Sequence, residues 1–180
     1  MFNLHNEIIE DFDTSDELVS VNYRVDFHNY FDALKQSEAY YEAVKNKTLI
    51  TRKENELHFH NFLEHQLFSR LQEIKYYSEV NITDTRRLVS VSSDCISTIQ
   101  LLVRDKIHVN VYFRSSDFDG ALPADLEFIC TLPHKLIIHL SKMINIKGYE
   151  DINTSLIEKL KNSEVQLNIM FGSLHRTIND

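Results

Sequence analysis

The chain has 180 residues, of which 43% are hydrophobic and 26% are charged. At about 150 residues per domain, this length predicts one domain over residues 1–180, with a core large enough to fold without disulfides or metals. The composition excludes a disordered tail and a collagen-like repeat, and no apolar run approaches the ~18 residues of a membrane span. Nineteen basic residues against 27 acidic residues give a formal net charge of -8, which argues against nonspecific binding to nucleic acid.

The N-terminal segment and the cysteine content favour a cytoplasmic protein. Residues Met1 to Glu7 lack the basic-then-apolar pattern of a signal peptide. The two cysteines alone do not build a disulfide framework. We therefore expect a cytoplasmic location, with both thiols reduced and no association with a membrane.

Hydrophobic periodicity predicts a strand and two helices in the N-terminal half. Leu18–Phe27 alternates between apolar and polar residues, which indicates a strand. Tyr30–Lys45 and Phe59–Tyr77 carry apolar residues at helical spacing. The face of the second helix that we expect to be buried consists of Phe62, Phe68, Leu71 and Ile74.

Three strands are predicted next, two of them in a hairpin. The β-branched residues of Arg87–Val91 favour a strand. Ile96–Val103 and Ile107–Arg114 are two strand-like runs separated by three polar residues. Alternation along the second run places Arg114 on its polar face.

The C-terminal part is predicted to contain two helices and a last strand. Asp125–Ile144 has the pattern of a long amphipathic helix, in which Pro133 should introduce a kink. Ser155–Lys161 predicts a short helix, and Val165–Met170 predicts the last strand. The order of elements indicates an α+β fold with a substantial sheet in the C-terminal half.

Four short motifs follow one another in the second half of the chain. They are Thr85-Arg86-Arg87-Leu88-Val89-Ser90, Asp94-Cys95-Ile96-Ser97-Thr98-Ile99-Gln100, Tyr112-Phe113-Arg114-Ser115-Ser116-Asp117 with Gly120-Ala121-Leu122-Pro123-Ala124-Asp125, and Gly172-Ser173-Leu174-His175. In this order they resemble the paired arginines, nucleophile strand, phosphate loop and ribose-binding strand end of the thymidylate synthase superfamily, which includes the pyrimidine-nucleotide hydroxymethylases. The resemblance is clear for residues 84–180 and implies a mixed sheet flanked by helices, with the sheet used for dimerisation.

The chemistry of this family requires a nucleophile, and the resemblance assigns that role to Cys95. A pyrimidine C5 is a poor nucleophile until a group adds to C6, and a thiolate can add there and later leave. Ile96 stands where the family usually has a His after the nucleophile. Cys130, within the predicted long helix, is interpreted as an inert buried residue.

Phosphate binding is assigned by the resemblance to four residues. Arg114 would bind the nucleotide phosphate, because a guanidinium matches phosphate oxygens, and Ser115 would add a hydroxyl. Arg86 and Arg87 would reach the phosphate held by the neighbouring subunit, which implies a homodimer with a largely apolar interface. If both arginines lay in one strand they would point to opposite faces, so at least one should sit in a loop. The alternative is a pair of solvated surface arginines.

Base and sugar recognition fall to the remaining motif residues. Asp125 stands where uracil-specific members of the family have Asn, and an ionised carboxylate only accepts hydrogen bonds, which suits the 4-amino group of cytosine. Asp117 is assigned to the base as well. His175 would bind the sugar hydroxyl, with Thr177 standing where the family has Tyr. The alternative for Asp125 is an acid favoured by the dipole at a helix N-terminus.

Two other patterns are weighed as metal sites, and neither is favoured. The segment His58–His65 does not place its histidines and Glu64 cleanly on one helical face, and no third ligand is evident. The acidic run Asp11–Glu17 lacks the glycine and terminal glutamate of a calcium loop and is interpreted as a solvated turn.

These observations favour a transferase of nucleotide biosynthesis. It would bind a pyrimidine nucleoside 5'-monophosphate, preferably with a cytosine-type base, and transfer a methyl or hydroxymethyl group to C5. The resemblance implies 5,10-methylenetetrahydrofolate as the donor, although the catalytic glutamate and the folate-binding segments of the family are not identified in residues 1–83. The first alternative is therefore a non-catalytic nucleotide-binding relative that has lost the folate site. A second is an interaction protein that uses only the scaffold.

Overall fold

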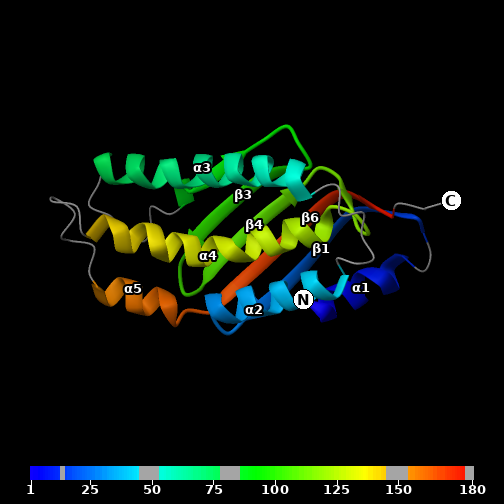
Figure 1. Cartoon of the computed structure of the whole chain (residues 1–180), viewed down its shortest axis with the longest axis horizontal. Helices are drawn as coiled ribbons and strands as arrows, with labels where there is room; N and C mark the ends of the chain where they lie inside the picture. The colour runs from blue at the N-terminus through cyan, green and yellow to red at the C-terminus, as the bar shows by residue number, and fades with distance from the viewer. Residues whose placement is uncertain (13–14, 45–52, 78–85, 145–153, 177–180) are drawn as a thin grey trace.

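The computed structural model of the chain (Figure 1) describes residues 1–12, 15–44, 53–77, 86–144 and 154–176. Its elements are α1 (Phe2–Phe12), β1 (Glu17–Phe27), α2 (Tyr30–Val44), α3 (Lys53–Tyr77), β2 (Val89–Val91), β3 (Ile96–Val103), β4 (Ile107–Phe113), β5 (Ser116–Asp117), α4 (Leu122–Ile144), α5 (Thr154–Lys161) and β6 (Val165–His175). The expected α+β class is confirmed. Within the described part of the chain, no helix is both long and apolar enough to cross a membrane.

One mixed sheet of six strands organises the molecule. Five strands follow one another in the order β1-β6-β4-β3-β2, and β5 pairs with β6. β6 runs parallel to β4 and β5, whereas the other pairs are antiparallel. The parallel pair of β4 and β6 is connected through α4 and α5, since a parallel connection needs a long crossover.

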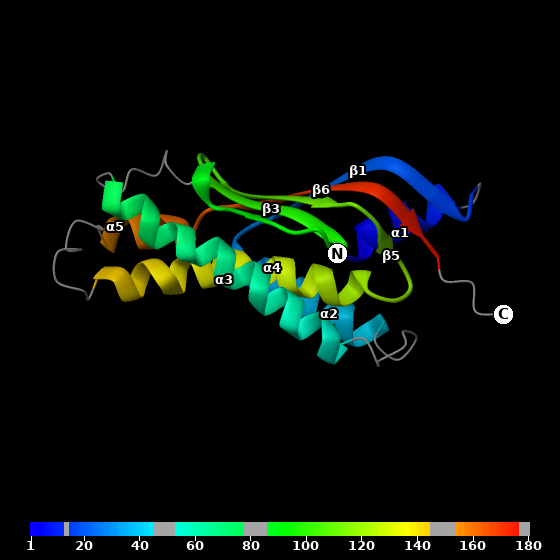
Figure 2. The same ribbon diagram turned by 90° about the horizontal axis from the view of Figure 1, so that it is seen from above.

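The helices gather on one side of this sheet, as Figure 2 shows from above. β4 alternates between buried and more exposed residues, as does most of β6, and the buried apolar side chains of both strands point toward the helical layer. These inward residues include Val109, Phe113, Leu167 and Phe171. They form one core with the buried face of α4, which contains Leu126, Ile129, Leu132 and Leu136. The core therefore lies between the sheet and the helices.

The predicted strands and helices agree closely with the observed ones, with a few differences. The hairpin of β3 and β4 and the helix α2 lie where they were predicted. α4 continues through Pro133, and β6 extends five residues beyond the predicted end at Met170. The predicted buried face of α3 is wrong at Phe62, which is 55% exposed. Phe68 and Leu71 are buried as predicted, and Leu63 and Leu67 complete the buried face at helical spacing. The side chain of Ile74 lies outside the described residues.

α1 was not predicted. Its buried residues Leu4, Ile8 and Phe12 are spaced by four, so they form one narrow apolar stripe between polar residues. Tyr23 of β1 donates a hydrogen bond of 2.6 Å to Asp11, which holds the end of α1 against the sheet.

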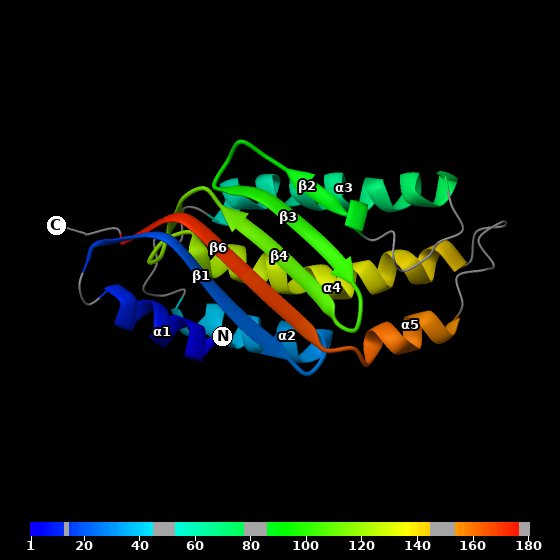
Figure 3. The ribbon, with the colours of Figure 1, turned by 180° about the vertical axis from the view of Figure 1, so that it is seen from behind.

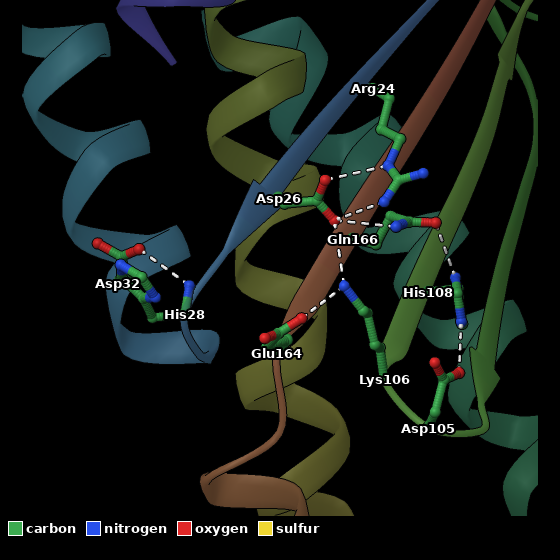
Figure 4. A network of polar contacts seen from close by, with 9 residues as sticks. All are labelled: Arg24, Asp26, His28, Asp32, Asp105, Lys106, His108, Glu164 and Gln166. Carbon is green, nitrogen blue, oxygen red and sulfur yellow. Dashed lines mark hydrogen bonds and ion pairs between the residues drawn. The ribbon is translucent and has the colours of Figure 1, made fainter.

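The opposite face of the sheet carries no helix among the described residues (Figure 3). Its outward positions combine polar side chains with exposed apolar ones such as Tyr112 and Met170. Figure 4 shows the polar network at the β3–β4 turn. Asp26 accepts hydrogen bonds from Arg24 and from Gln166, at 3.0 and 2.9 Å. The pKa of Asp26 is lowered, first by the bond from Gln166 and then by Arg24. The Lys106 ammonium lies 3.6 Å from Asp26 and 2.5 Å from Glu164.

Amide side chains continue this polar surface across the middle of the sheet. Asn168 donates to Asn110 at 2.8 Å, and Asn110 donates to Gln100 at 3.1 Å. An open hollow of about 560 Å³ lies over these three residues and is also lined by Tyr112 and Met170. Amides and exposed apolar side chains thus share the outward positions of three neighbouring strands, and the largely apolar dimer interface on this sheet stays a prediction.

Candidate functional site

The backbone of Arg114 joins three segments that are far apart in the sequence. Its N–H donates a hydrogen bond of 2.8 Å to the carbonyl oxygen of Cys95, just before β3. Its own carbonyl accepts a hydrogen bond of 3.1 Å from the N–H of Ser173, in β6. Next to it, Asp117 of β5 pairs with His175 of β6. We call Cys95, Arg114, Ser115 and His175 the strand-end cluster.

The strands change their regular pattern at this end of the sheet. The β3–β4 register shifts between Ile96 and Thr98. In β1, Ser20 has a φ of 56°, a left-handed conformation that is uncommon for a residue with a side chain. In β6, a Cβ added to Gly172 would lie 2.8 Å from the carbonyl oxygen of Arg114. Glycine therefore allows β6 to approach Arg114 closely enough for the adjacent hydrogen bond.

The two cysteines lie in opposite environments. Cys95 is exposed at the start of β3, whereas Cys130 is buried in α4. Burial raises the pKa of the Cys130 thiol to about 12, so this thiol stays protonated at neutral pH. The bend before Cys95 is closed by Asp94, whose N–H donates to the Ser92 hydroxyl at 2.9 Å.

The loop after β4 presents one exposed cation and a buried acid. Arg114 is exposed and continues the outward alternation of β4, as predicted, and Ser115 beside it is half-buried. The Asp117 carboxylate is buried and accepts a hydrogen bond of 3.1 Å from the N–H of Gly120. That bond shapes the loop that leads into α4.

Arg86 and Arg87 are both exposed and lie outside β2, in the turn before it. The side-chain amide of Gln100 donates a hydrogen bond of 3.1 Å to the carbonyl oxygen of Arg86. Gln100 lies opposite Asn110 in the β3–β4 pair. Arg114 follows Asn110 by four residues, which is about 13 Å along an extended strand. The fold therefore does not bring these two arginines to the Arg114 of the same chain.

Asp125 is buried near the start of α4 and bonded to a residue that sequence reasoning did not select. Its Oδ1 lies 2.7 Å from Nε2 of His60, in α3. The Asp125 carboxylate therefore binds a side chain of another helix, in addition to its position near the dipole at the N-terminus of α4. Position 60 falls on the same helical face as Leu63 and Leu67, so the spacing could have identified His60 as a buried histidine that needs a partner.

The far edge of the strand-end cluster carries His175 and a further cation. His175 is exposed at the end of β6. Arg176 follows it and pairs with Asp119 at 3.1 Å, and its guanidinium lies 5.8 Å from the ring centres of Phe12 and Phe118. Sequence reasoning did not select Arg176. Thr177 lies outside the described residues.

Three further cavities lie among the helices. Between α3 and α4, one of about 170 Å³ is lined by His60, Glu64 and Phe128, and a neighbouring one of about 300 Å³ by His65 and His139 among others. A third of about 320 Å³ lies beside α4 and α5. None of these three is lined by Cys95. In the described ranges, no group of three or more His, Cys, Asp or Glu side chains could hold a metal ion.

Comparison with known proteins gives distant structural similarity only. No family model matches the sequence, and no curated protein matches it. Thymidylate synthase from T4 phage is similar in structure, with 15% identity and a TM-score of 0.46 over 99% of this chain and 77% of that chain. Thermostable thymidylate synthase A from Bacillus subtilis has 15% identity and a TM-score of 0.45 over 97% of this chain and 78% of its own.

The different environments of the two cysteines predict selective modification. A mild alkylating agent should label Cys95 well before Cys130, because Cys130 is buried and its pKa is raised. Peptide mass spectrometry after brief treatment of the native protein measures the order. In denatured protein both thiols should react alike, and Cys95→Ser should remove the early label. Earlier labelling of Cys130 in native protein would contradict the assignment of Cys95 as the accessible nucleophile.

Proposed function

We propose that the chain is a pyrimidine-nucleotide C5 transferase, in which the strand-end cluster binds a nucleoside 5'-monophosphate. The observation that carries this proposal is the pair of backbone hydrogen bonds at Arg114, which bring Cys95, the loop of Arg114 and Ser115, and the end of β6 together. A thiol nucleophile beside an exposed guanidinium and a hydroxyl is the combination that this chemistry needs. Motifs that are about 80 residues apart in the sequence thus meet at one end of the strands β3, β4 and β6.

The proposed chemistry begins at Cys95. Its thiolate adds to C6 of the pyrimidine, a carbon–sulfur bond forms, and the electron pair of the C5–C6 double bond makes C5 nucleophilic. C5 then forms a bond to the one-carbon unit, whose bond to the donor breaks. Water adds to that carbon for a hydroxymethyl product, or the donor would supply a hydride for a methyl product. Loss of the C5 proton to a base expels the thiolate and restores the double bond. In this proposal, Arg114 and Ser115 hold the phosphate and His175 binds the sugar hydroxyl.

The donor in this proposal is a reduced folate, 5,10-methylenetetrahydrofolate, on the basis of the sequence resemblance. When bound, it would supply the carbon for C5. The three cavities among the helices do not include Cys95, and the open hollow on the sheet does not include it either. The residues that line these cavities and the hollow thus give no specific fit for the folate.

A homodimer completes the proposed phosphate site. Arg86 and Arg87 are exposed on the edge of the sheet and lie far along the strand from Arg114 of their own chain. In this proposal, the uncovered face of the sheet (Figure 3) packs against the same face of a second copy, which would bring the arginines of one subunit to the Arg114 of the other. The polar amides on that face would then pair across the interface.

Nucleotide binding and base preference test the proposal together. dCMP and CMP should raise the unfolding temperature more than dUMP and UMP, and at 100 times Kd the stabilisation should be about 2.7 kcal/mol. Asp125→Asn should flatten or reverse the preference by about 1–3 kcal/mol, since an amide can both donate and accept. Calorimetry with the four nucleotides measures both effects. Absence of binding to all four would contradict the proposed function.

Subunit mixing tests whether the arginines act across an interface. Arg87→Ala should weaken nucleotide binding by about 1.5–3 kcal/mol, the range for a charge-assisted hydrogen bond. If Arg87→Ala and Cys95→Ala chains are refolded together, half of the dimers are mixed, and each mixed dimer has one site with both residues intact. Transferase activity should reappear at about one site in four.

Two controls accompany the mixing experiment. Light scattering should show that each variant alone is a dimer. Cys95→Ala alone should be inactive, and Arg87→Ala alone should have little activity at a nucleotide concentration well below its own Kd. A monomeric wild type, or dimeric variants that recover no activity on mixing, would show that Arg87 does not serve the site of the partner. Binding without any turnover in the wild type would favour the non-catalytic relative instead.

A further inference from the structure

The His60–Asp125 pair joins two helices through buried polar groups. The Nε2–Oδ1 distance is 2.7 Å, and the two residues are only 8% and 2% exposed. A carboxylate oxygen can only accept, so Nε2 of His60 carries the hydrogen and donates it to Asp125. A buried ionised carboxylate is costly without such a donor, which gives His60 a direct influence on the charge of Asp125.

The imidazole ring of His60 is held in one orientation. It stacks on Phe128 of α4, with 4.3 Å between ring centres and an angle of 4° between planes. The Lys135 ammonium also lies near Phe128, 5.6 Å from the ring centre, and it pairs with Glu64 of α3. Stacking thus holds the plane of the ring, and the hydrogen bond directs Nε2 toward Asp125.

The bond leaves Asp125 with one oxygen for another partner. His60 Nε2 is bonded to Oδ1 of Asp125. Among the described residues, Oδ2 of Asp125 has no hydrogen bond. Burial raises the pKa of Asp125, and the hydrogen bond and charge of His60 oppose that rise. The other charged groups around His60 are Glu64 from α3 and Glu127 and Lys135 from α4, which line the same cavity.

We propose that His60 is a positioning residue for base recognition, which holds Asp125 as an anion and leaves Oδ2 to accept from the 4-amino group of cytosine. This inference rests on the proposed function, because it presumes that Asp125 meets the base. With His60 in place, the carboxylate repels O4 of uracil. Without His60, Asp125 takes a proton more readily, and its hydroxyl can then donate to O4 of uracil or to N3 of cytosine.

Three variants separate positioning from packing. His60→Leu removes the donor, and His60→Gln keeps an N–H donor without a titratable ring. His58→Leu is the matched control, because His58 is exposed on the same helix. Among the described residues, it has no contact with the strand-end cluster. A purely structural role of His60 would lower stability and the binding of all nucleotides alike, at every pH.

The first measurement is the dCMP to dUMP affinity ratio by calorimetry from pH 6 to pH 9. The wild type and His58→Leu should keep a constant ratio across this range. In His60→Leu the ratio should fall about tenfold at the lower pH values and recover as pH rises and Asp125 ionises, and His60→Gln should lie closer to the wild type. An unchanged ratio and pH profile in His60→Leu would overturn the role of His60 while leaving the proposed function intact.

The second measurement needs no nucleotide. The carboxyl ¹³C resonance of Asp125, assigned by its loss in Asp125→Asn, should titrate at a higher pH in His60→Leu than in the wild type. Equal titration in both proteins would overturn the proposal. If the wild type binds neither dCMP nor dUMP, the proposed function fails and the assignment of His60 to base recognition fails with it, whatever the carboxyl titration shows.

Discussion

The peptide group of Arg114 is the constraint on which the candidate site depends. Its N–H binds the carbonyl of Cys95, and its carbonyl binds the N–H of Ser173, so one residue fixes the relative positions of three strands. The arrangement requires close approach by β6, which the absence of a Cβ at Gly172 permits. A side chain at position 172 would force the backbone of Arg114 to move, because the atom it meets is a carbonyl oxygen rather than a flexible side-chain end.

Alternation along the strands divides the site between two faces of the sheet. Arg114 continues the outward series of β4, on the side that carries no helix among the described residues. Asp125 and His60 belong to the helical layer on the other side. In the proposed mode of binding, the nucleotide passes the end of the sheet, with its phosphate toward the uncovered face and its base toward α4.

Local patterns predicted much of the fold, because alternation and helical spacing depend on neighbouring residues. The hairpin of β3 and β4 is predicted almost to its ends, and its alternation gives the side of Arg114 correctly. α1 was missed because three apolar residues at a spacing of four make a narrow signal. The His60–Asp125 bond could not be predicted as a pair, since it joins residues 65 positions apart through the packing of two helices. Motif order selected the strand-end cluster, but only the strand pairing shows which of its members meet.

The most direct test of the central claim is hydrogen exchange at C5 of dCMP in D₂O, followed by the loss of the H5 proton signal in NMR. Addition of Cys95 to C6 makes C5 nucleophilic, so C5 can take deuterium from the solvent before the thiolate leaves, and no one-carbon donor is needed. The account predicts exchange by the wild type and none by Cys95→Ser, although the variant still binds dCMP. Nucleotide binding with no exchange in the wild type, or equal exchange in Cys95→Ser, would contradict it.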